Sequence, residues 1–534
     1  MEKPADLIRQ GRSEEVWKRY CGFLDITLEQ FMDIQERLLL EQLQLMGRSE
    51  LGRTIMGEHP PQSVQEFRER VPITTYEDYA FCLDERKEDL LPEKPVAWAH
   101  TSGRSGSYKW YPCTARSFAK IGEGVLAWLI LSTTNQRGVV RLEPGDILVY
   151  NVASRPYMSG FGAMSLAELF EMRYVPTVEE MEQMSFQERI QAGFRMGMRT
   201  GIDVVGSISS VLVKIGDEFS KGASAKVSAA MLHPAVLARM GRAWVRSRLA
   251  RRAILPRDLW RVKGIMVSGM DTDIYRDRIR EYWGVEPTEG YGMTEGPATI
   301  AVQAWDRKGL YFLPDVSFLE FIPESEWTRW RADESYMPKT VLLDEVELGT
   351  RYEVVLTNFY GGPMMRYRLH DLVEFVRYRD EDEGIELPSM TFAGRVADLI
   401  DLANFTGLID EKLIWQAIAN TGIPHEEWAV RKELLGEHAG LHLYIELKED
   451  VAAEDVAQRV HEQLMDLNPF YVDLVSFLEI RPMQVTVLRQ GTFQRYTQKQ
   501  MAAGVDVAHL KPRHMNAPDA VIADLLHAGD GTGG

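Results

Sequence analysis

The chain has 534 residues, too many for one ordinary core, so we expect two or more domains. Hydrophobic residues make up 45% and charged residues 26%, the balance of a globular protein. The formal net charge of -18 argues against a nucleic-acid partner, because such proteins usually carry a basic footprint.

Cysteine usage and the chain's apolar runs indicate the compartment. Cys21, Cys82 and Cys113 show no metal-ligand spacing and cannot pair evenly, which indicates a reducing compartment. The charged N-terminal stretch lacks the apolar core of a signal peptide. No uncharged apolar run approaches the ~20 residues that a membrane helix needs. We therefore expect a cytoplasmic protein with no membrane partner.

Helical spacing of apolar residues dominates the first part of the chain. Residues 25–57, "DITLEQFMDIQERLLLEQLQLMGRSELGRTIMG", are predicted to be helical, with a capping box from Thr27 and Gln30 at their start. Further along, strand-like and helix-like segments alternate. Residues 147–153, 262–269 and 352–359 are short apolar runs, whereas residues 185–200 have a helical pattern. This alternation predicts an α/β fold whose sheets are covered by helices.

The pattern changes from about residue 400. Residues 441–449 and 475–488 are typical of strands, and residues 453–467 are typical of an amphipathic helix. We predict a large N-terminal domain over residues 1–397 and a smaller α+β C-terminal domain over residues 398–534. The last domain ends in a glycine-rich tail that we expect to be mobile.

Residues 101–109, "TSGRSGSYK", combine glycines, hydroxyls and a lysine. Gly103 and Gly106 let backbone N–H groups turn inward, and Lys109 adds a positive charge, a combination that suits a phosphate. An ordinary polar turn between strands is the alternative. The run lacks the spacing of a P-loop.

Three further stretches carry candidate ligand-binding residues. In residues 289–301, "EGYGMTEGPATIA", Tyr291 could stack on a base and Glu295 could bind Mg²⁺, but the stretch could also be a helix start capped by Thr294. In residues 364–375, "MMRYRLHDLVEF", Asp371 could accept ribose hydroxyls and the arginines could bind an anion, unless they form an exposed ion pair. The last stretch offers Arg395 and Asp398.

The order of these four stretches resembles the adenylate-forming superfamily, whose motifs are written T-S-G-T-T-G-x-P-K, Y-G-x-T-E, Y-R-T-G-D and G-R-x-D-D. Within it, the chain resembles the Gretchen-Hagen-type acyl acid amido synthetases, the auxin-conjugating family and its bacterial relatives. The similar segments are residues 67–83, residues 354–375 and residues 491–515, "GTFQRYTQKQMAAGVDVAHLKPRHM", where Lys511 matches the signature lysine. The chain departs from the motifs at Arg104, His370, His509 and Pro512.

The resemblance implies a ligase that uses ATP and Mg²⁺. It would activate a small carboxylic acid as an acyl-adenylate and transfer the acyl group to an amine, an amino acid in the family. An acyl- or aryl-CoA ligase and a nucleotide-binding protein without turnover are the alternatives. Implied catalytic residues are Lys511, Glu295 (which also holds the metal) and Lys109; implied nucleotide-binding residues are Thr101, Ser102, Gly103, Ser105, Gly106, Tyr291, Gly292, Met293, Thr294, Asp371 and Arg395.

The remaining expectations concern the substrates. The acid pocket should lie between Asp146 and about Gly206, where aromatic, Met and small residues gather, and the resemblance implies a hinge near Asp398. Arg431 and Lys432, on a predicted helix, do not form an evident CoA site. Arg495 or Lys499 could bind the carboxylate of an amino acid.

Overall fold

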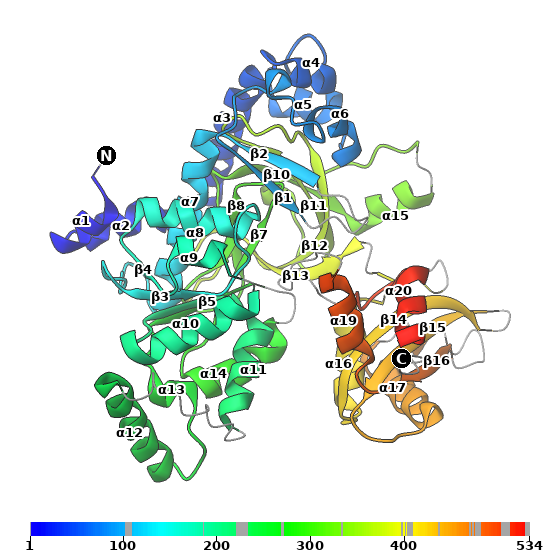
Figure 1. The fold of residues 1–534 in the computed structure, drawn as a ribbon. Helices are drawn as coiled ribbons and strands as arrows, with labels where there is room; N and C mark the ends of the chain where they lie inside the picture. Colours follow the sequence, from blue (N-terminus) through cyan, green and yellow to red (C-terminus); the bar gives the residue numbers. More distant parts are fainter. Residues whose placement is uncertain are drawn as a thin grey trace. The chain divides into compact units, whose positions relative to one another are not determined.

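The structure is a computed structural model, shown in Figure 1. It divides into two compact units, each described by itself below: unit 1 comprises Met1–Leu369 and Val373–Phe392, and unit 2 comprises His370–Leu372 and Ala393–Gly534. The predicted domain boundary at residues 397 and 398 lies outside the described residues and stays a prediction. The structure describes residues 2–101, 109–184, 186–220, 233–268, 272–332, 335–396, 399–400, 402, 409–435, 438–468, 471–472, 475, 482–502 and 513–528.

Unit 1 begins with helices, as the apolar spacing predicts. The predicted capping box is present, because Gln30 N donates to Thr27 Oγ1 at 3.2 Å and Thr27 N donates to Gln30 Oε1 at 2.9 Å. This cap satisfies two N–H groups that the first turn leaves open. The helices are α1 (Pro4–Arg9), α2 (Ser13–Tyr20), α3 (Leu28–Met46), α4 (Glu50–Met56), α5 (Val64–Arg70) and α6 (Ala80–Leu83).

One large sheet organises the rest of unit 1. Its strand order is β10-β11-β12-β13-β9-β8-β7-β6-β5-β3-β4, and the pairs from β4 to β7 are parallel. The strands are β3 (Ile147–Tyr150), β4 (Arg173–Tyr174), β5 (Val204–Ile208), β6 (Gly264–Ser268), β7 (Thr288–Met293), β8 (Ala298–Gln303), β9 (Leu310–Phe312), β10 (Ser317–Pro323), β11 (Arg351–Asn358), β12 (Tyr367–Arg377) and β13 (Ser389–Arg395).

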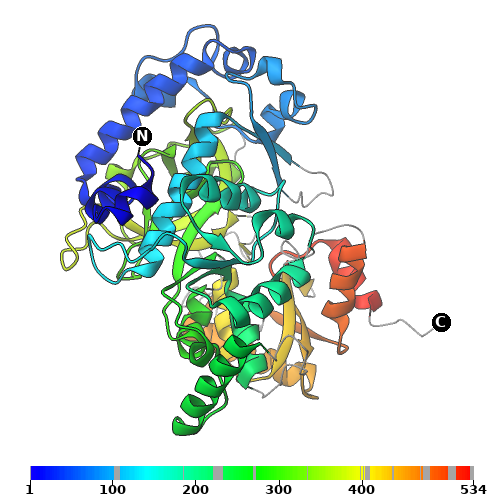
Figure 2. The same ribbon diagram turned by 60° about the vertical axis from the view of Figure 1, so that its left-hand side comes forward.

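Helices cover both faces of the parallel part of the sheet. Successive strand residues alternate between two cores: Leu148 belongs to one hydrophobic cluster and Val149 to the other. The first cluster includes residues of α7 (Ala115–Thr133) and α8 (Met158–Leu169); the second includes residues of α10 (Phe186–Thr200), α11 (Ser209–Ser220) and α14 (Thr272–Trp283). Figure 2 shows the helices around this sheet from a second side. The predicted helix-covered α/β fold is confirmed.

A separate antiparallel pair lies beside the large sheet. Strand β1 (Ala97–Thr101) pairs with β2 (Lys109–Cys113). The remaining helices of unit 1 are α9 (Val178–Glu182), α12 (Pro234–Leu249), α13 (Pro256–Leu259) and α15 (Glu324–Ala332).

Unit 2 has its own sheet and core, which confirms the predicted smaller α+β domain. The sheet order is β14-β15-β16, from β14 (His425–Leu435), β15 (His438–Leu447) and β16 (Met483–Leu488). The prediction of a helix at Arg431 and Lys432 is wrong, because both lie in β14, where Arg431 pairs with Glu433 and Asp519. The helices are α16 (Glu411–Asn420), α17 (Ala453–Leu467), α19 (Thr492–Ala502) and α20 (Asp519–Ala528).

Among the described residues, none of the helices has both the length and the apolar character needed to cross a membrane. Cys21, Cys82 and Cys113 are all buried free thiols.

Candidate active site

The phosphate-type loop connects β1 to β2. Thr101 is the last residue of β1 and is paired in register with Lys109, the first residue of β2. Ser102, Gly103, Arg104, Ser105 and Gly106 lie outside the described residues. The structure thus places the two ends of the loop side by side, and the loop's own role stays a prediction.

Lys109 lies against a tyrosine. Its Nζ is 4.8 Å from the centroid of the Tyr76 ring and 3.9 Å from Glu77 Oε1. Tyr76 is held in turn, since its hydroxyl donates to Asp84 at 2.8 Å and accepts from Trp110 N at 3.0 Å. A cation over an aromatic face gains electrostatic stabilisation without losing its donors. Lys109 could therefore still donate to a phosphate, in competition with Glu77.

The Y-G-M-T-E run forms a hairpin, which corrects the alternative of a helix start at Thr294. Tyr291, Gly292 and Met293 belong to β7, and the turn from Thr294 leads into β8. A Cβ at Gly292 would lie 2.3 Å from the carbonyl oxygen of Ala298, so only glycine allows this close pairing of strands.

Glu295, in that turn, meets residues from two other motifs. Tyr111 Oη donates to Glu295 Oε1 at 3.4 Å and lies 3.3 Å from Tyr367 Oη. The carboxylate accepts only, so the chain of donation runs from Tyr367 to Tyr111 to Glu295. Asn358 Nδ2 donates to the Glu295 carbonyl oxygen at 3.0 Å and fixes the turn. We call Tyr111, Glu295 and Tyr367 the Tyr–Glu cluster.

Both phenols of the Tyr–Glu cluster stay protonated. Burial, followed by the charge of Glu295, raises the pKa of Tyr111 and of Tyr367 well above the ordinary value. Tyr111 is 2% exposed and Tyr367 5%. They act as hydrogen-bond donors at physiological pH, and Glu295, which is half-buried, can still face a ligand.

The arginines that flank Tyr367 belong to the framework. Arg366 is 2% exposed and donates from Nε and Nη2 to both oxygens of buried Glu320, at 3.0 and 2.9 Å. Arg368 binds buried Glu353 with two donors and lies 4.3 Å from the Trp330 ring. Arg366 and Arg368 therefore neither bind a ligand anion nor form an exposed Arg–Asp pair, the two possibilities that the sequence suggested. Each arginine instead neutralises a buried carboxylate whose charge would otherwise be uncompensated.

Residues 67–83, one of the segments similar to the family, pack against the start of β12. Thr74 N donates to the Arg366 carbonyl at 2.9 Å, and Arg368 N donates to the Thr74 carbonyl at 2.9 Å. Tyr79 is fully buried and accepts from Met365 N at 2.9 Å. This backbone pairing fixes the residues on both sides of Tyr367.

Asp371 and Arg395 come together within unit 2. Arg395 Nε donates to Asp371 Oδ1 at 3.0 Å, and Asp371 is 6% exposed whereas the Arg395 side chain is 46% exposed. His370, which replaces the motif glycine, has φ +62°, in the left-handed region that glycine adopts freely. Histidine is among the residues that tolerate this region, so the local backbone that the motif needs is retained.

Two predicted residues of the C-terminal half, Asp398 and Lys511, lie outside the described residues. The segment after Lys511 is anchored in unit 2: His514 contacts Glu411 Oε1 at 2.5 Å and Glu427 Oε1 at 2.7 Å and stacks on Trp428 at 4.3 Å. Burial alone would lower the pKa of His514, but the two carboxylates outweigh it and raise the pKa to about 9. Lys499, by contrast, is paired with Asp524 at 2.7 Å.

A small pocket lies at the carboxyl end of β3, inside the region predicted for the acid. The space it encloses is only about 10 Å³, room for about one water molecule, and it opens to solvent. Next to it, Asn151 is fully buried, and neither atom of its amide has a hydrogen-bond partner in the described part of the chain. Ligands of open α/β sheets bind outside such strand ends. The pocket is lined by Tyr150, Val152, Ala153, Ser154, Arg155, Gly160, Ala163, Val178, Met181 and Glu182.

Neither Tyr111 nor Tyr367 is among the residues that the sequence motifs predict for the site. Tyr111 follows Lys109 by two residues in a strand, so strand periodicity places both side chains on one face. Tyr367 carried no comparable local signal, because its partner is 256 positions away in the chain.

Comparison with known proteins supports the resemblance. One solved structure, an acyl acid amido synthetase titled AtGH3.15 in complex with 2,4-DB, has a TM-score of 0.70 and 17% identity, covering 99% of this chain and 98% of that one. A 2-hydroxyisobutyryl-CoA ligase in the postadenylation state, in complex with R3-HIB-AMP, has a TM-score of 0.58 and 14% identity, covering 98% and 93%. At these identities the likeness shows a shared fold.

Sequence matches are more specific. The jasmonoyl–L-amino acid synthetase GH3.5 of Oryza sativa subsp. japonica is 27% identical over 282 residues, 50% of this chain and 47% of that protein. The chain thus spans about half the length of this curated relative. Family descriptions match in three places: the GH3 family N-terminal domain at residues 22–192, the central domain at residues 310–395 and the C-terminal domain at residues 412–518. Since these matches follow one another in chain order and cover more than half of the 534 residues, the protein belongs to the GH3 family.

Proposed function

We propose that this protein is an ATP-dependent ligase that activates a small carboxylic acid as an acyl-adenylate and transfers the acyl group to an amine, an amino acid. The observation that carries the proposal is the Tyr–Glu cluster. It joins β2, which follows the phosphate-type loop, to the Y-G-M-T-E hairpin and to the Y-R strand through two hydroxyls and one carboxylate. Membership of the GH3 family, and relatives named as amido synthetases, support the same activity.

In the first step a carboxylate oxygen of the acid forms a bond to the α-phosphorus of ATP, and pyrophosphate leaves. Two anions must approach, so positioning and charge compensation supply most of the catalysis. Thr101, the loop with Ser102, Gly103, Ser105 and Gly106, and Lys109 would hold the departing phosphates. Asp371, oriented by Arg395, would accept the ribose hydroxyls, and Tyr291, Gly292, Met293 and Thr294 would flank the adenine and the α-phosphate.

Glu295 suits Mg²⁺. This ion is commonly held by one or two carboxylates together with substrate phosphates and waters, and among the described residues there is no cluster of three or more metal-ligating side chains. A single half-buried carboxylate, steadied by Tyr111, matches that mode of binding. When bound, the ion would neutralise phosphate charge.

In the second step the amine nitrogen forms a bond to the acyl carbon. The bond from that carbon to the phosphate oxygen of the mixed anhydride breaks, AMP leaves with the oxygen, and the nitrogen loses a proton. Lys511 would compensate the charge between the acid's carboxylate and the α-phosphate during adenylation. A hinge near Asp398 would let the C-terminal domain, residues 398–534, change position between the steps, because the two steps need different groups at one centre.

The test is product analysis with the full chain, ATP, Mg²⁺ and an acid library, adding either amino acids or CoA. We expect pyrophosphate release that depends on an acid, followed by an amide product detected by mass spectrometry. Thioester formation without any amide would replace the proposal with the CoA-ligase alternative. Absence of pyrophosphate release with every acid, despite ATP binding, would leave a nucleotide-binding protein.

A further inference from the structure

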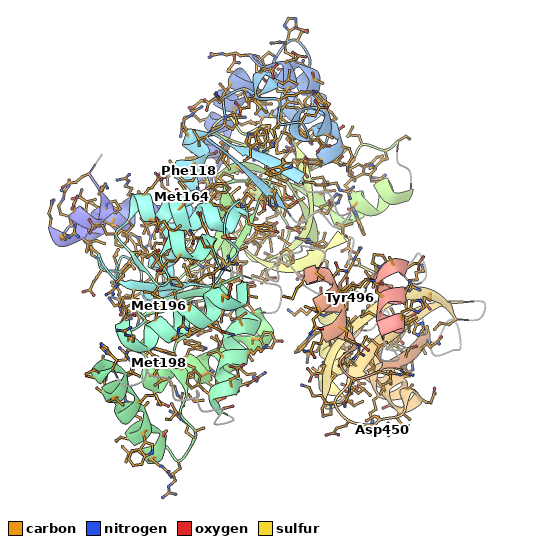
Figure 3. All side chains as sticks on the ribbon, viewed as in Figure 1. Phe118, Met164, Met196, Met198, Asp450 and Tyr496 are labelled. Carbon is orange, nitrogen blue, oxygen red and sulfur yellow. The ribbon has the colours of Figure 1, made fainter. Side chains whose placement is uncertain are left out.

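Helix α12 is a basic segment in an acidic protein. The chain as a whole carries a net charge of -18, yet residues 219–257 contain two lysines, seven arginines and no aspartate or glutamate. Figures 1 and 2 show α12 in dark green at the edge of unit 1, and its contacts are with α10 and α13. Figure 3 marks Met196 and Met198 on α10.

One face of α12 is anchored and another is exposed. Val236, Ala243 and Ser247 are buried, and Arg239 donates to the carbonyl oxygen of Met198. At about 100° per residue, these three buried side chains lie on the side of the helix turned away from a second group of apolar residues. The second group is Leu237, Trp244, Val245 and Leu249, which are 55%, 55%, 49% and 81% exposed.

These four exposed residues, which we call the α12 stripe, fall within an arc of about 140°. Exposed single apolar residues are ordinary, but four exposed apolar residues gathered on one helix face, with Arg248 among them, are typical of an interaction surface. The stripe lies among cations. Arg248 is 5.6 Å from the Trp244 ring, and Arg242, Arg246, Arg248 and Arg251 form no ion pair with any residue that the structure describes.

We propose that α12 is a docking surface for an anionic lipid bilayer. Four arginines without carboxylate partners attract a negatively charged surface such as anionic lipid headgroups. The phosphate backbone of a nucleic acid offers no apolar surface that could bind Leu237 and Leu249. Trp and Leu beside Arg on one helix are instead typical of an amphipathic helix that lies at a membrane interface. The helix surface is convex, and a fluid bilayer surface accommodates such a shape without a preformed groove. Contact with the surface of a bilayer needs no spanning segment, so it agrees with the finding that no helix of the described residues could span a membrane. It does replace the expectation that the protein has no membrane partner.

The experiment is flotation of the full chain with two kinds of vesicle, phosphatidylcholine alone and phosphatidylcholine with about one-third phosphatidylglycerol. No ATP or acid is added, so the result does not depend on the proposed ligase activity. We expect at least about tenfold more protein bound to the anionic vesicles, and weaker binding as salt rises, since salt screens the arginines. Replacing Arg242 and Arg246 by Gln should lower binding about fivefold per arginine.

Matched variants separate the stripe from general effects. Leu237→Ser with Trp244→Ser should abolish vesicle binding, while Met337→Ser with Leu348→Ser, which removes exposed apolar residues elsewhere in unit 1, should leave it unchanged. Equal binding to both vesicle types, no binding to anionic vesicles, or equal loss in both double variants would overturn the proposal. So would tighter binding of RNA or polyglutamate that survives Leu237→Ser with Trp244→Ser, because the surface would then serve a polyanion.

Discussion

Replacing Glu295 by Gln separates its charge from its place in the fold. The amide oxygen of Gln can still accept from Tyr111, so the Tyr–Glu cluster keeps its hydrogen bond, but the negative charge is lost. A hydrogen bond to a charged group contributes about 1.5–3 kcal/mol and a neutral one about 0.5–1.5. The Tyr111 bond is long at 3.4 Å, so we expect the free energy of unfolding to fall by at most about 1 kcal/mol.

Activity should respond far more strongly. If Glu295 holds Mg²⁺ against the phosphates, loss of its charge should lower acid-dependent ATP–pyrophosphate exchange at least about 100-fold, the size of effect that one preorganised electrostatic group has in other enzymes. The assay is exchange at increasing Mg²⁺, with thermal unfolding measured in parallel. Glu383→Gln is the matched control, because this half-buried carboxylate also accepts from an aromatic donor, Trp305 Nε1 at 2.5 Å. Exchange within twofold of the unaltered chain at saturating Mg²⁺ would remove Glu295 from the site.

Three further predictions concern other parts of the molecule. Asp371→Asn should weaken ATP binding by about 1.5–3 kcal/mol without unfolding the protein, measured by calorimetry; an unchanged dissociation constant would leave Asp371 as the ion-pair partner of Arg395 alone. His514 has a raised folded-state pKa of about 9, so its stabilising contribution is complete below pH ~6.5 and is lost as pH rises through 9, by about 3 kcal/mol at most. Urea unfolding across this range should show the loss in the unaltered chain and not in His514→Gln. Asn151→Leu should raise the free energy of unfolding by about 1–3 kcal/mol, because it removes an unpartnered buried amide, and should raise KM for the acid; lower stability would mean that the amide is satisfied in the folded protein.

Local signals predicted much of the fold. The Thr27–Gln30 capping box closes within one helical turn, so the sequence alone contains it. The alternation at Leu148 and Val149 likewise follows from strand periodicity and a sheet covered on both faces. The prediction failed at Arg431 and Lys432, where two adjacent charges suggested a solvated helix. Pairing of β14 with β15 overrides local propensity there, and the charge of Arg431 is satisfied by Glu433 and by Asp519, which is 88 positions away.

In the candidate site, too, some features follow from local sequence and others depend on contacts between distant segments. The order of the motifs and the residue types predict Glu295, Asp371 and Lys109 as site residues, and these roles stay predictions. The motifs could not indicate what the arginines of the third stretch bind, since Glu320 lies on β10 and Arg366 comes 46 positions later, just before β12. Contacts of that kind depend on pairing between strands far apart in the chain, which a short stretch of sequence does not reveal.

The protonation of the Tyr–Glu cluster restricts how the second step can proceed. The amine must lose a proton, and a general base needs a pKa near the working pH. Tyr111 and Tyr367 cannot serve, because burial and the charge of Glu295 raise their pKa far above that range. Glu295 itself is engaged by Tyr111 and, in the proposed function, by the metal. In the proposed function the cluster would therefore bind and orient the nucleotide in both steps, and the proton of the amine would leave through a group outside the cluster or through water.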